Sequence, residues 1–415
     1  MRVVIVGGGP AGASAAGLLA QQGVDVLLLE KARFPRHHVG ESLQPASLEL
    51  LDEHLGLGEE LRSQGFANKF GAVYVWGESR EPWSVLFDER LERALPETEA
   101  ELLAGDFESA LQVDRARFDT LLLRAAEAQG AEVREGVEVR SVQLEGRRGV
   151  ELVDGSFEPA DLVLDASGQR CLLGRDLGTL RMVQDLRCSA TYAYVEGAGG
   201  VPGVLGRHVQ WVVTVPEGWA WFIPVSATRT SVGLVYKEKG LLSAERFWER
   251  IEGAFPCKRE QVDGELRFAK DWSFTNTAFC GEGYALLGDA ACFVDPILSG
   301  GVDFAIRSGF AAATSALTGD WGSYEDSLRR QYKAYLRLAR YWYGNNRSVD
   351  GFFWQAHREI PAHATATPLR AFVYLTTGRY AAERHLKVFQ RWQEEKMFKA
   401  LGVDAAALEK ARKKR

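Results

Sequence analysis

A run of glycines near the N-terminus restricts the fold of this chain more than any other feature. Residues 7–12 read Gly-Gly-Gly-Pro-Ala-Gly, directly after the apolar residues 2–6 and before a helix-like stretch that continues to about Gln22. A second apolar stretch, residues 24–30, follows a glycine stop. This order predicts a β-α-β unit, because glycines between a strand and a helix form the tight turn with which such units begin.

The same glycines have the spacing of a phosphate-binding turn. Gly7, Gly9 and Gly12 form G-x-G-x-x-G, and a backbone without Cβ atoms at these positions can approach a diphosphate at the positive end of the helix. Glu30 closes the second strand near the spacing of about 20 residues that is typical of a ribose-binding carboxylate. We therefore expect the following residues to bind a nucleotide: Gly7, Gly9, Pro10, Ala11, Gly12 and Glu30.

Two further strand ends favour FAD over NAD. Asp165-Ala166-Ser167-Gly168 closes one short apolar strand, and Gly288-Asp289 follows another at residues 284–287. Asp289 can accept a hydrogen bond from a sugar or ribityl hydroxyl, and the turn at 165–168 can place backbone near the same cofactor. Each segment alone is also a common strand-end turn. Their presence behind the N-terminal unit is what indicates FAD.

Composition argues against several classes of protein. A chain of 415 residues is too long for one small core, and its net charge of -6 argues against a nucleic-acid-binding surface. No stretch approaches the run of about 18 apolar residues that spans a bilayer, and we identify no signal peptide. The five cysteines are scattered, and the histidines lack metal-ligand spacing. We expect a cytoplasmic protein without a membrane span, a metal site or a nucleic-acid partner.

The remaining pattern divides the chain into three parts. Helices are expected near 45–54 and 113–129, the second capped by Asp114, and β-hairpins over 131–153. Residues 182–196 and 209–236 alternate with period two, which predicts an antiparallel sheet, and the pattern from Val302 to the basic tail 410–415 is helical. We expect an α/β fold with three regions: a discontinuous Rossmann-like FAD-binding domain (1–70, 105–180 and 270–325), an inserted antiparallel β-sheet substrate domain (71–104 and 181–269) and a helical C-terminal region (326–415).

Taken in order, these motifs resemble the FAD monooxygenase superfamily that has the p-hydroxybenzoate hydroxylase fold. The matching segments are residues 7–12 with Glu30, the stretch Asp114-Arg115-Ala116-Arg117-Phe118-Asp119, residues 165–168 and residues 288–296. The resemblance covers about the first 330 residues. It implies an FAD domain of that type, with the inserted sheet lying over the flavin.

Three strings within this region are similar to flavin-dependent halogenases. Val39-Gly40-Glu41-Ser42-Leu43 matches a segment beside the flavin, Trp219-Ala220-Trp221-Phe222-Ile223-Pro224 matches W-x-W-x-I-P, and residues 293–301 match F-x-x-P-x-x-S-x-G. Lys69 stands where the family's essential lysine is expected. The similarity is to the branch that acts on phenols and pyrroles, often tethered to a carrier protein. Asp303 departs from the pattern, because a histidine or a neutral residue is expected there.

The resemblance also implies roles for individual residues. Reduced flavin and O2 form a C4a-hydroperoxide that oxidises chloride or bromide to hypohalous acid, which Lys69 binds as an ammonium or converts to a chloramine. Backbone amides at Ser299 and Gly300 are expected to bind the halide or a flavin carbonyl. Trp219 and Trp221 separate the substrate from the flavin, or are core residues of the inserted sheet. The expected FAD contacts beyond the nucleotide motif are Lys31, Arg36, Glu41, Ser42, Arg117, Ala166, Gly168, Gly288, Asp289, Pro296, Gly300 and Gly301.

Other functions remain open at this point. The same scaffold serves aromatic monooxygenases and geranylgeranyl-reductase-like enzymes, and a flavin-binding docking module without turnover is a third reading. No second glycine-rich nucleotide unit is visible. Reducing equivalents are therefore expected from NAD(P)H, directly or through a separate flavin reductase. The expected partners are a small aromatic substrate, a flavin reductase and a carrier protein.

Overall fold

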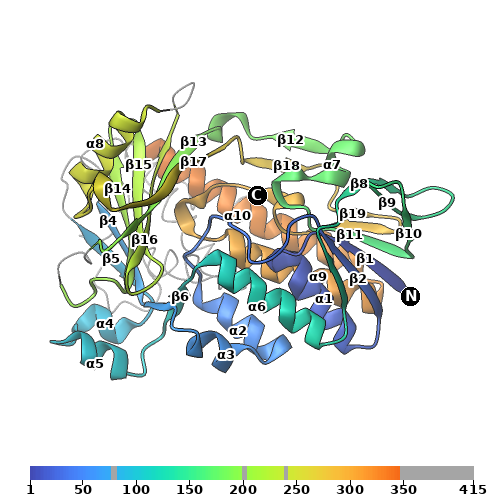
Figure 1. Ribbon diagram of the computed structural model, residues 1–415, viewed down its shortest axis with the longest axis horizontal. Coiled ribbons are helices and arrows are strands. Elements are labelled where there is room, and N and C mark those ends of the chain that lie inside the picture. Colours follow the sequence, from blue (N-terminus) through green and yellow to red (C-terminus); the bar gives the residue numbers. More distant parts are fainter. Residues whose placement is uncertain (76–81, 199–202, 238–241, 346–415) are drawn as a thin grey trace, which may run out of the picture.

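The computed structural model describes residues 1–75, 82–198, 203–237 and 242–345, and Figure 1 shows two large sheets joined by a layer of helices. The first sheet has six strands in the order β19-β20-β11-β1-β2-β7. Its strands are β1 (Arg2–Val6), β2 (Asp25–Glu30), β7 (Glu132–Glu135), β11 (Leu162–Asp165), β19 (Cys280–Gly281) and β20 (Tyr284–Leu286). All neighbours are parallel except β19 and β20, so the central strands are buried.

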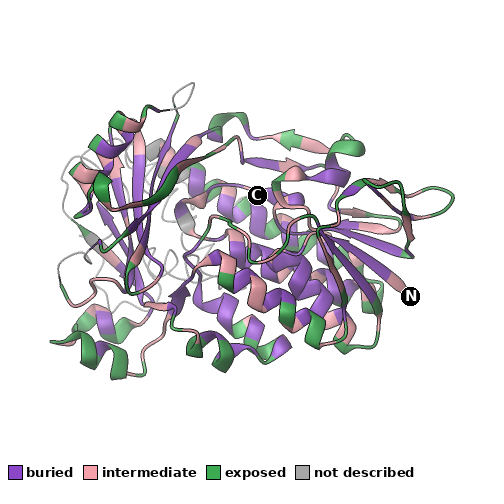
Figure 2. Cartoon of the chain, viewed as in Figure 1, coloured by how far each residue is buried: buried purple, intermediate pink, exposed green. Residues whose placement is uncertain are grey.

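Helices pack beside this parallel sheet. They are α1 (Pro10–Gln21), α6 (Arg115–Ala128) and α9 (Gly301–Thr318), with α2 (Pro45–Leu55) and α3 (Gly58–Ser63) packed on these helices. The helices α1 and α9 approach closely, because a Cβ atom at Gly309 would lie 2.4 Å from the carbonyl oxygen of Ala11. Figure 2 shows that the parallel strands and the inner helices are buried. A small antiparallel sheet of β8 (Val139–Gln143), β9 (Gly149–Leu152) and β10 (Phe157–Pro159) adds Val150 and other apolar side chains to the same core.

The second large sheet has seven strands in the order β17-β13-β16-β15-β14-β4-β5. They are β4 (Gly71–Val75), β5 (Trp83–Leu86), β13 (Ser189–Glu196), β14 (Val209–Val215), β15 (Gly218–Pro224), β16 (Arg229–Tyr236) and β17 (Val262–Lys270). Side chains of β15 alternate: Trp219 and Trp221 join the core shared with the parallel sheet, whereas Phe222 packs under α8 (Ala244–Ala254). The sheet therefore presents Trp219 and Trp221 to the FAD-type domain.

Shorter elements connect the two sheets. The pair β3 (Ala67–Lys69) and β6 (Ala110–Gln112) is antiparallel, and β12 (Leu180–Met182), β18 (Phe274–Asn276) and β21 (Cys292–Phe293) form a small sheet. The remaining α-helices are α4 (Glu89–Arg93), α5 (Glu99–Ala104), α7 (Leu172–Asp176) and α10 (Trp321–Asn345). The 3-10 turns are η1 (Gly168–Arg170), η2 (Gln184–Leu186), η3 (Arg259–Gln261), η4 (Gly288–Ala290) and η5 (Pro296–Leu298).

The structure confirms the α/β class and revises several local expectations. Asp114 caps α6 by accepting hydrogen bonds from the amides of Ala116 (2.8 Å) and Arg117 (3.3 Å). The prediction of β-hairpins over 131–153 is wrong for the first strand of that range. This strand, β7, pairs in parallel with β2 instead of forming a hairpin. The inserted sheet is not fully antiparallel, since β4 lies parallel to β14, and residues 89–93 and 99–104 are helical. The tail 410–415 lies outside the described residues.

We propose the three-part division of the chain that the sequence suggests. The parallel sheet draws its strands from residues 2–30, 132–165 and 280–286, and the strands of the second sheet come from 71–86 and 189–270. None of the helices within the described ranges combines the length and the hydrophobicity needed to cross a bilayer.

Candidate functional site

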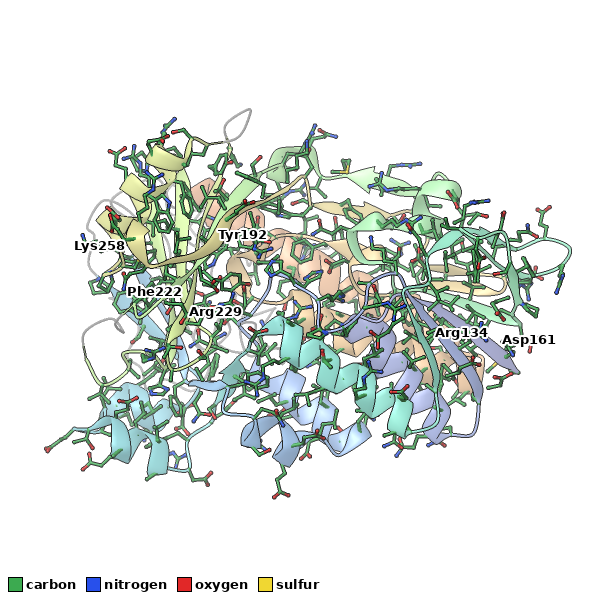
Figure 3. The ribbon with its side chains drawn as sticks, in the orientation of Figure 1. Arg134, Asp161, Tyr192, Phe222, Arg229 and Lys258 are labelled. Atoms are coloured by element: carbon green, nitrogen blue, oxygen red, sulfur yellow. The ribbon has the colours of Figure 1, made fainter. Side chains whose placement is uncertain are left out.

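A cavity of about 560 Å³ lies between the two large sheets. It extends from the glycine turn after β1 to the tryptophans of β15 and the segment before α9, so both sheets contribute to its wall. Figure 3 shows Tyr192 on the side of the seven-stranded sheet that faces the parallel sheet. A ligand in this cavity would contact residues from both domains at once.

The glycine turn at one end of the cavity tolerates no side chain at two positions. Gly7 has φ +109°, and a Cβ atom there would lie 2.4 Å from the carbonyl oxygen of Ala166. A Cβ atom at Gly12 would lie 1.9 Å from the carbonyl oxygen of Gly7. At Gly9, in contrast, a Cβ atom would meet only the Arg36 guanidinium, at 3.4 Å. The turn is thus fixed by backbone packing and open toward the cavity, as a diphosphate site requires.

Glu30 braces this turn. Its carboxylate accepts hydrogen bonds from the amide of Gly8 (2.7 Å) and from the amide of Ala32 (2.8 Å), and the side chain lines the cavity. Both carboxylate oxygens of Glu30 therefore accept backbone hydrogen bonds in this structure. Each oxygen still has a lone pair that can accept a hydrogen bond from a ligand hydroxyl. The residues present fit the ADP half of FAD: bare amides at the start of α1 with a carboxylate at the end of β2.

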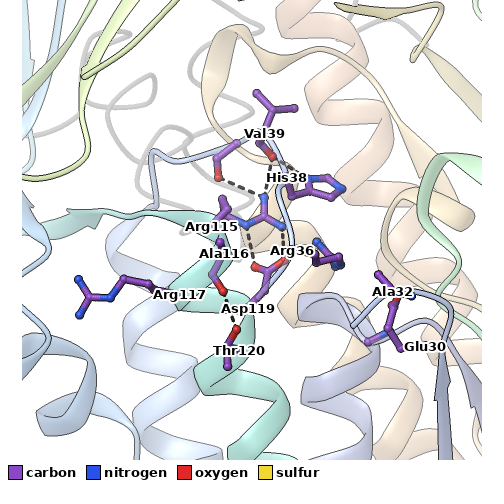
Figure 4. Close-up of polar contacts among 12 residues, drawn as sticks. Glu30, Ala32, Arg36, His38, Val39, Arg115, Ala116, Arg117, Asp119 and Thr120 are labelled. Carbon is purple, nitrogen blue, oxygen red and sulfur yellow. Dashed lines mark hydrogen bonds and ion pairs between the residues drawn. The ribbon is translucent and has the colours of Figure 1, made fainter. Parts of the chain in front are cut away.

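Two arginines share one buried carboxylate beside the turn (Figure 4). Arg115 donates to Asp119 through Nε (2.7 Å) and Nη2 (3.0 Å), and Arg36 lies 3.1 Å from the same carboxylate. Arg115 also donates to the carbonyl oxygen of Val39 (2.7 Å). Burial alone would raise the pKa of Asp119, but the two guanidinium groups hold it below its usual value. The two arginines carry one more positive charge than the carboxylate that they share, which suits a diphosphate.

The sequence pointed to Arg117, and the structure places Arg115 in the cavity instead. Arg117 donates to the carbonyl oxygen of Gln64 (3.0 Å), stacks over Phe66 and points away from Arg36 in Figure 4. Arg115 lines the cavity and is almost fully buried. One sequence feature could have identified Arg115: Asp119 follows it by four residues, and residues with this spacing lie on the same face of a helix and can form an ion pair.

We expect replacement of Asp119 by alanine to lower the free energy of unfolding by about 3–5 kcal/mol, since it leaves Arg115 buried without its partner. The contribution of Asp119 is present above its ordinary pKa of about 4 and is lost as the pH falls through the lowered folded value. Urea unfolding at pH 7 and pH 3 measures both effects. The control is Glu127→Ala on the same helix, whose exposed pair with Arg124 contributes about 0–1 kcal/mol. Equal losses in the two variants would contradict this account.

A polar loop ties the FAD-type domain to the seven-stranded sheet. Glu41 accepts a hydrogen bond from the hydroxyl of Tyr194 (2.6 Å) and another from the amide of Gly40 (3.0 Å). His37 stacks on Tyr192, with 3.1 Å between Nε2 and the hydroxyl. Burial lowers the pKa of His37 to about 4, so its ring is neutral at pH 7. Lys31, His38 and Ser42 complete this side of the cavity.

Aromatic rings line the opposite wall. The ring centroids of Trp219 and Trp221 are 5.9 Å apart, and Tyr192 follows Trp221 at 6.1 Å. The indole of Trp219 donates to the hydroxyl of Tyr343 (2.8 Å), which in turn lies 3.1 Å from both carboxylate oxygens of Asp295. Burial raises the pKa of Asp295 to about 7. These bonds fix one indole plane and connect α10 to the cavity wall.

The segment before α9 completes the cavity. Pro296, Ser299 and Gly301 line it, whereas Gly300 does not, and a Cβ atom at Gly300 would lie 2.1 Å from the Tyr335 hydroxyl. Asp303, which departs from the family pattern, does not line the cavity. Its carboxylate pairs with Arg307 (2.8 Å) and accepts from Ser47 (3.2 Å), so its charge is compensated outside the cavity.

Strand ends of the parallel sheet supply the remaining polar groups. Asp289 lines the cavity, and burial raises its pKa to about 6 although Arg115 acts in the opposite direction. Ala166 and Gly168 also line it, at a turn where Asp165 accepts hydrogen bonds from the amides of Ser167 (2.9 Å) and Leu173 (2.8 Å). Gly288 lies outside, and its amide donates to the Ser308 hydroxyl (2.7 Å).

Lys69 is buried next to the cavity but does not line it. Only 2 % of the residue is exposed, and its Nζ donates to the carbonyl oxygen of Leu43 (2.9 Å) and lies 5.2 Å from the centre of the Phe87 ring. Within the described residues no carboxylate lies within ion-pair distance of it. Burial lowers the pKa of Lys69 to about 7. Leu43 follows Ser42, which does line the cavity.

The structure thus brings most of the expected site residues together and leaves five outside the lining. Those outside are Gly12, Lys69, Arg117, Gly288 and Gly300. The lining residues that the sequence interpretation passed over include Arg115, Tyr192 and Gln210. No cluster of metal-binding side chains occurs in the part of the chain that the structure describes.

The fold and the cavity define an FAD-dependent oxidoreductase. A family model for FAD-binding domains matches residues 1–171, and the tryptophan halogenase family model matches residues 88–413. Tryptophan 2-halogenase from Chondromyces crocatus is 33% identical over 387 residues, which are 86% of this chain and 70% of that protein. The 1H-pyrrole-2-carbonyl-[peptidyl-carrier protein] chlorinase from Pseudomonas fluorescens is 32% identical over 74% of this chain and 73% of its own length.

Solved structures give the same result. The myxobacterial chondrochloren halogenase CndH aligns with a TM-score of 0.73 and 33% identity, over 94% of this chain and 92% of that one. The chain belongs to the flavin-dependent halogenases.

Proposed function

We propose that this protein uses FAD to halogenate an aromatic substrate of the phenol or pyrrole type. The observation that carries the proposal is the position of Lys69. It is a buried amine without a carboxylate partner among the described residues, and it donates to the carbonyl oxygen of Leu43, the residue that follows cavity-lining Ser42. Aromatic hydroxylation needs no such amine, because the oxygen goes directly from flavin to substrate. A diffusing electrophile does need a group that retains it.

Each part of the cavity has a task in this proposal. The glycine turn, Glu30 and the pair of Arg36 and Arg115 bind the ADP half of FAD. Trp219 and Trp221 separate the aromatic substrate from the flavin ring. The bound flavin, once reduced, supplies with O2 the oxidising power that converts a halide to hypohalous acid. The amide of Ser299 donates to the carbonyl oxygen of Pro296 (3.0 Å), so the halide is assigned to the backbone amides in the first turn of α9, beginning with cavity-lining Gly301. The N-terminus of this 18-residue helix favours an anion.

The proposed substrate and protein partners are argued from one relative and from the sequence of this chain. The pyrrole chlorinase acts on a carrier-bound pyrrole, and we propose a carrier-tethered substrate here as an alternative to a free phenol. We propose a separate flavin reductase as the source of reduced flavin, because we see no second glycine-rich nucleotide unit. All five cysteines are free thiols, in keeping with a reducing cytoplasm.

Incubation with FAD, a flavin reductase, NADH and bromide tests the function. We expect brominated product, identified by the bromine isotope doublet in mass spectra, from at least one member of a panel of phenols, free pyrroles and a carrier-bound pyrrole. Hydroxylated product with substrate-stimulated NADPH oxidation in the absence of the reductase would support a monooxygenase instead. Bound FAD without either product would support the docking module.

The pKa of Lys69 predicts the pH dependence of bromination. Burial lowers that pKa from 10.5 to about 7, and a site without a carboxylate favours the neutral amine, which can react with hypohalous acid. The amine fraction decreases as the pH falls through 7. The rate of bromination should therefore fall tenfold per pH unit below about 6, and single-turnover product formation from pH 5 to 9 measures it. A rate that falls above pH 7 would show that the ammonium form acts instead.

A further inference from the structure

Ser299 has a backbone conformation that a side chain disfavours. Its φ is +53° and its ψ is +28°, the left-handed region, which glycine adopts freely and serine does not. The residue stands between η5 and the first turn of α9, and it lines the cavity. A strained residue at such a place persists only where neighbouring contacts hold it.

Gln210 supplies that contact from the other domain. It lies on β14, opposite Ala72 of β4, and is 4 % exposed. Its Oε1 accepts a hydrogen bond from the Ser299 hydroxyl (2.8 Å), and its side chain also bonds the buried hydroxyl of Tyr74. Gln210 lines the cavity as well. One carboxamide therefore connects two strands of the seven-stranded sheet to the segment that precedes α9.

We propose that Gln210 is a positioning residue for the halide: it holds Ser299 in the left-handed conformation from which α9 starts, and so places the first-turn amides of α9, beginning with cavity-lining Gly301, beside the cavity. The inference rests on the proposed function, which assigns the halide to these amides. It goes further by making halide affinity depend on a side chain of the seven-stranded sheet. FAD affinity should depend much less on Gln210 than halide affinity does, because the glycine turn and the arginine pair hold the ADP half of FAD.

The neutral amide suits this position. A glutamate would have the same length and could accept the same hydrogen bond, but it would put a negative charge beside the anion. The nearby Asp303 carries such a charge, and the structure pairs it with Arg307, away from the cavity. The ion pair with Arg307 thus offsets the negative charge of Asp303 in the first turn of α9.

Bromide titration of the oxidised FAD-bound protein tests the proposal without turnover. The change in flavin absorbance gives the bromide dissociation constant, and the KM for bromide is measured alongside. For Gln210→Leu we expect both constants to rise about tenfold, as for one lost hydrogen bond that fixes a binding group. For Gln210→Glu, which keeps the acceptor, we expect a larger rise that shrinks at high ionic strength. The dissociation constant of FAD should stay within about twofold of wild type in both variants.

A matched control and a double-mutant cycle separate positioning from general damage. Thr214→Val removes a hydrogen bond from Thr214 to the Val75 carbonyl (3.1 Å), which joins the same two strands away from the cavity, and should leave bromide affinity unchanged. In a Ser299→Gly background, glycine adopts the left-handed conformation without help. The Gln210→Leu substitution should then change bromide affinity by less than about threefold relative to that background.

The outcomes distinguish this inference from the proposed function. If wild type brominates a substrate but Gln210→Leu binds bromide as wild type does, the role of Gln210 is refuted and the function stands. The role is also refuted if Gln210→Leu weakens bromide equally with serine or glycine at position 299. If wild type gives no brominated product, the proposed function itself fails.

Discussion

Replacement of Lys69 by alanine will reduce product bromination at least about 100-fold while the protein still binds FAD and the reduced flavin still consumes O2. The side chain is buried and does not line the cavity, and its Nζ donates to the Leu43 carbonyl and lies over the Phe87 ring. Its loss therefore removes no flavin contact. Hypohalous acid generated in the cavity would diffuse into water instead of meeting the amine.

The measurement compares three quantities in one reaction: brominated product, O2 consumed, and hypobromous acid trapped by an added thiol or dye. We expect the first to collapse in Lys69→Ala, the second to stay within about twofold of wild type and the third to rise. Lys258→Ala, which removes an exposed lysine on the far side of the seven-stranded sheet, is the control (Figure 3). Bromination by Lys69→Ala at half the wild-type rate or more would contradict the assigned role.

Replacement of Gly12 by alanine will yield protein without FAD and with a lower free energy of unfolding. The added Cβ atom would lie 1.9 Å from the carbonyl oxygen of Gly7, and a backbone atom cannot move aside as a side chain can. The turn must open, and loss of one or two of its hydrogen bonds to the charged diphosphate, each about 1.5–3 kcal/mol, would reduce the affinity for FAD about 100-fold. Overpacking of this kind reduces stability by about 1–3 kcal/mol.

The flavin absorbance of the purified protein and its thermal unfolding measure both effects. Gly17→Ala is a matched control, because it is the same substitution on the same helix, α1, and its Cβ atom would meet a methyl group of Leu55 at 2.9 Å, which can rotate away. We expect Gly17→Ala to retain FAD. Yellow Gly12→Ala protein with wild-type FAD content would show that the turn does not bind the diphosphate.

The sequence predicted local structure best where that structure depends on residues close together in the chain. The turn after β1, the cap at Asp114 and the alternation of Trp219 and Trp221 along β15 all follow from local geometry. The strand β7 was misassigned because Glu132–Glu135 is polar and lies at the edge of the parallel sheet, so its pattern resembles an exposed hairpin. Its pairing depends on β2, about a hundred residues earlier in the chain.

The cavity was harder to predict because its key contacts join distant segments. Gln210 and Ser299 are 89 positions apart, and Trp219 and Tyr343 are 124 apart. No periodicity links such residues. The choice between Arg115 and Arg117 depends on which side of α6 meets the rest of the domain, and a stretch with arginines at both positions does not reveal it. Lys69 likewise lies on β3, which pairs with β6, and its Nζ reaches the Leu43 carbonyl and the Phe87 ring, so its surroundings come from segments that no local pattern connects.

The order of strands in the parallel sheet has a consequence for how the chain is made. Strand β1 pairs with β2 and β11, and β11 pairs with β20, so Val6 and Leu286 lie on either side of Asp165 in the sheet. A ribosome must release most of the polypeptide before the nucleotide-binding layer can close. Gene fragments that stop before Tyr284 should therefore give no yellow protein, however intact their glycine turn, and fragments of this kind are candidates for chaperone capture.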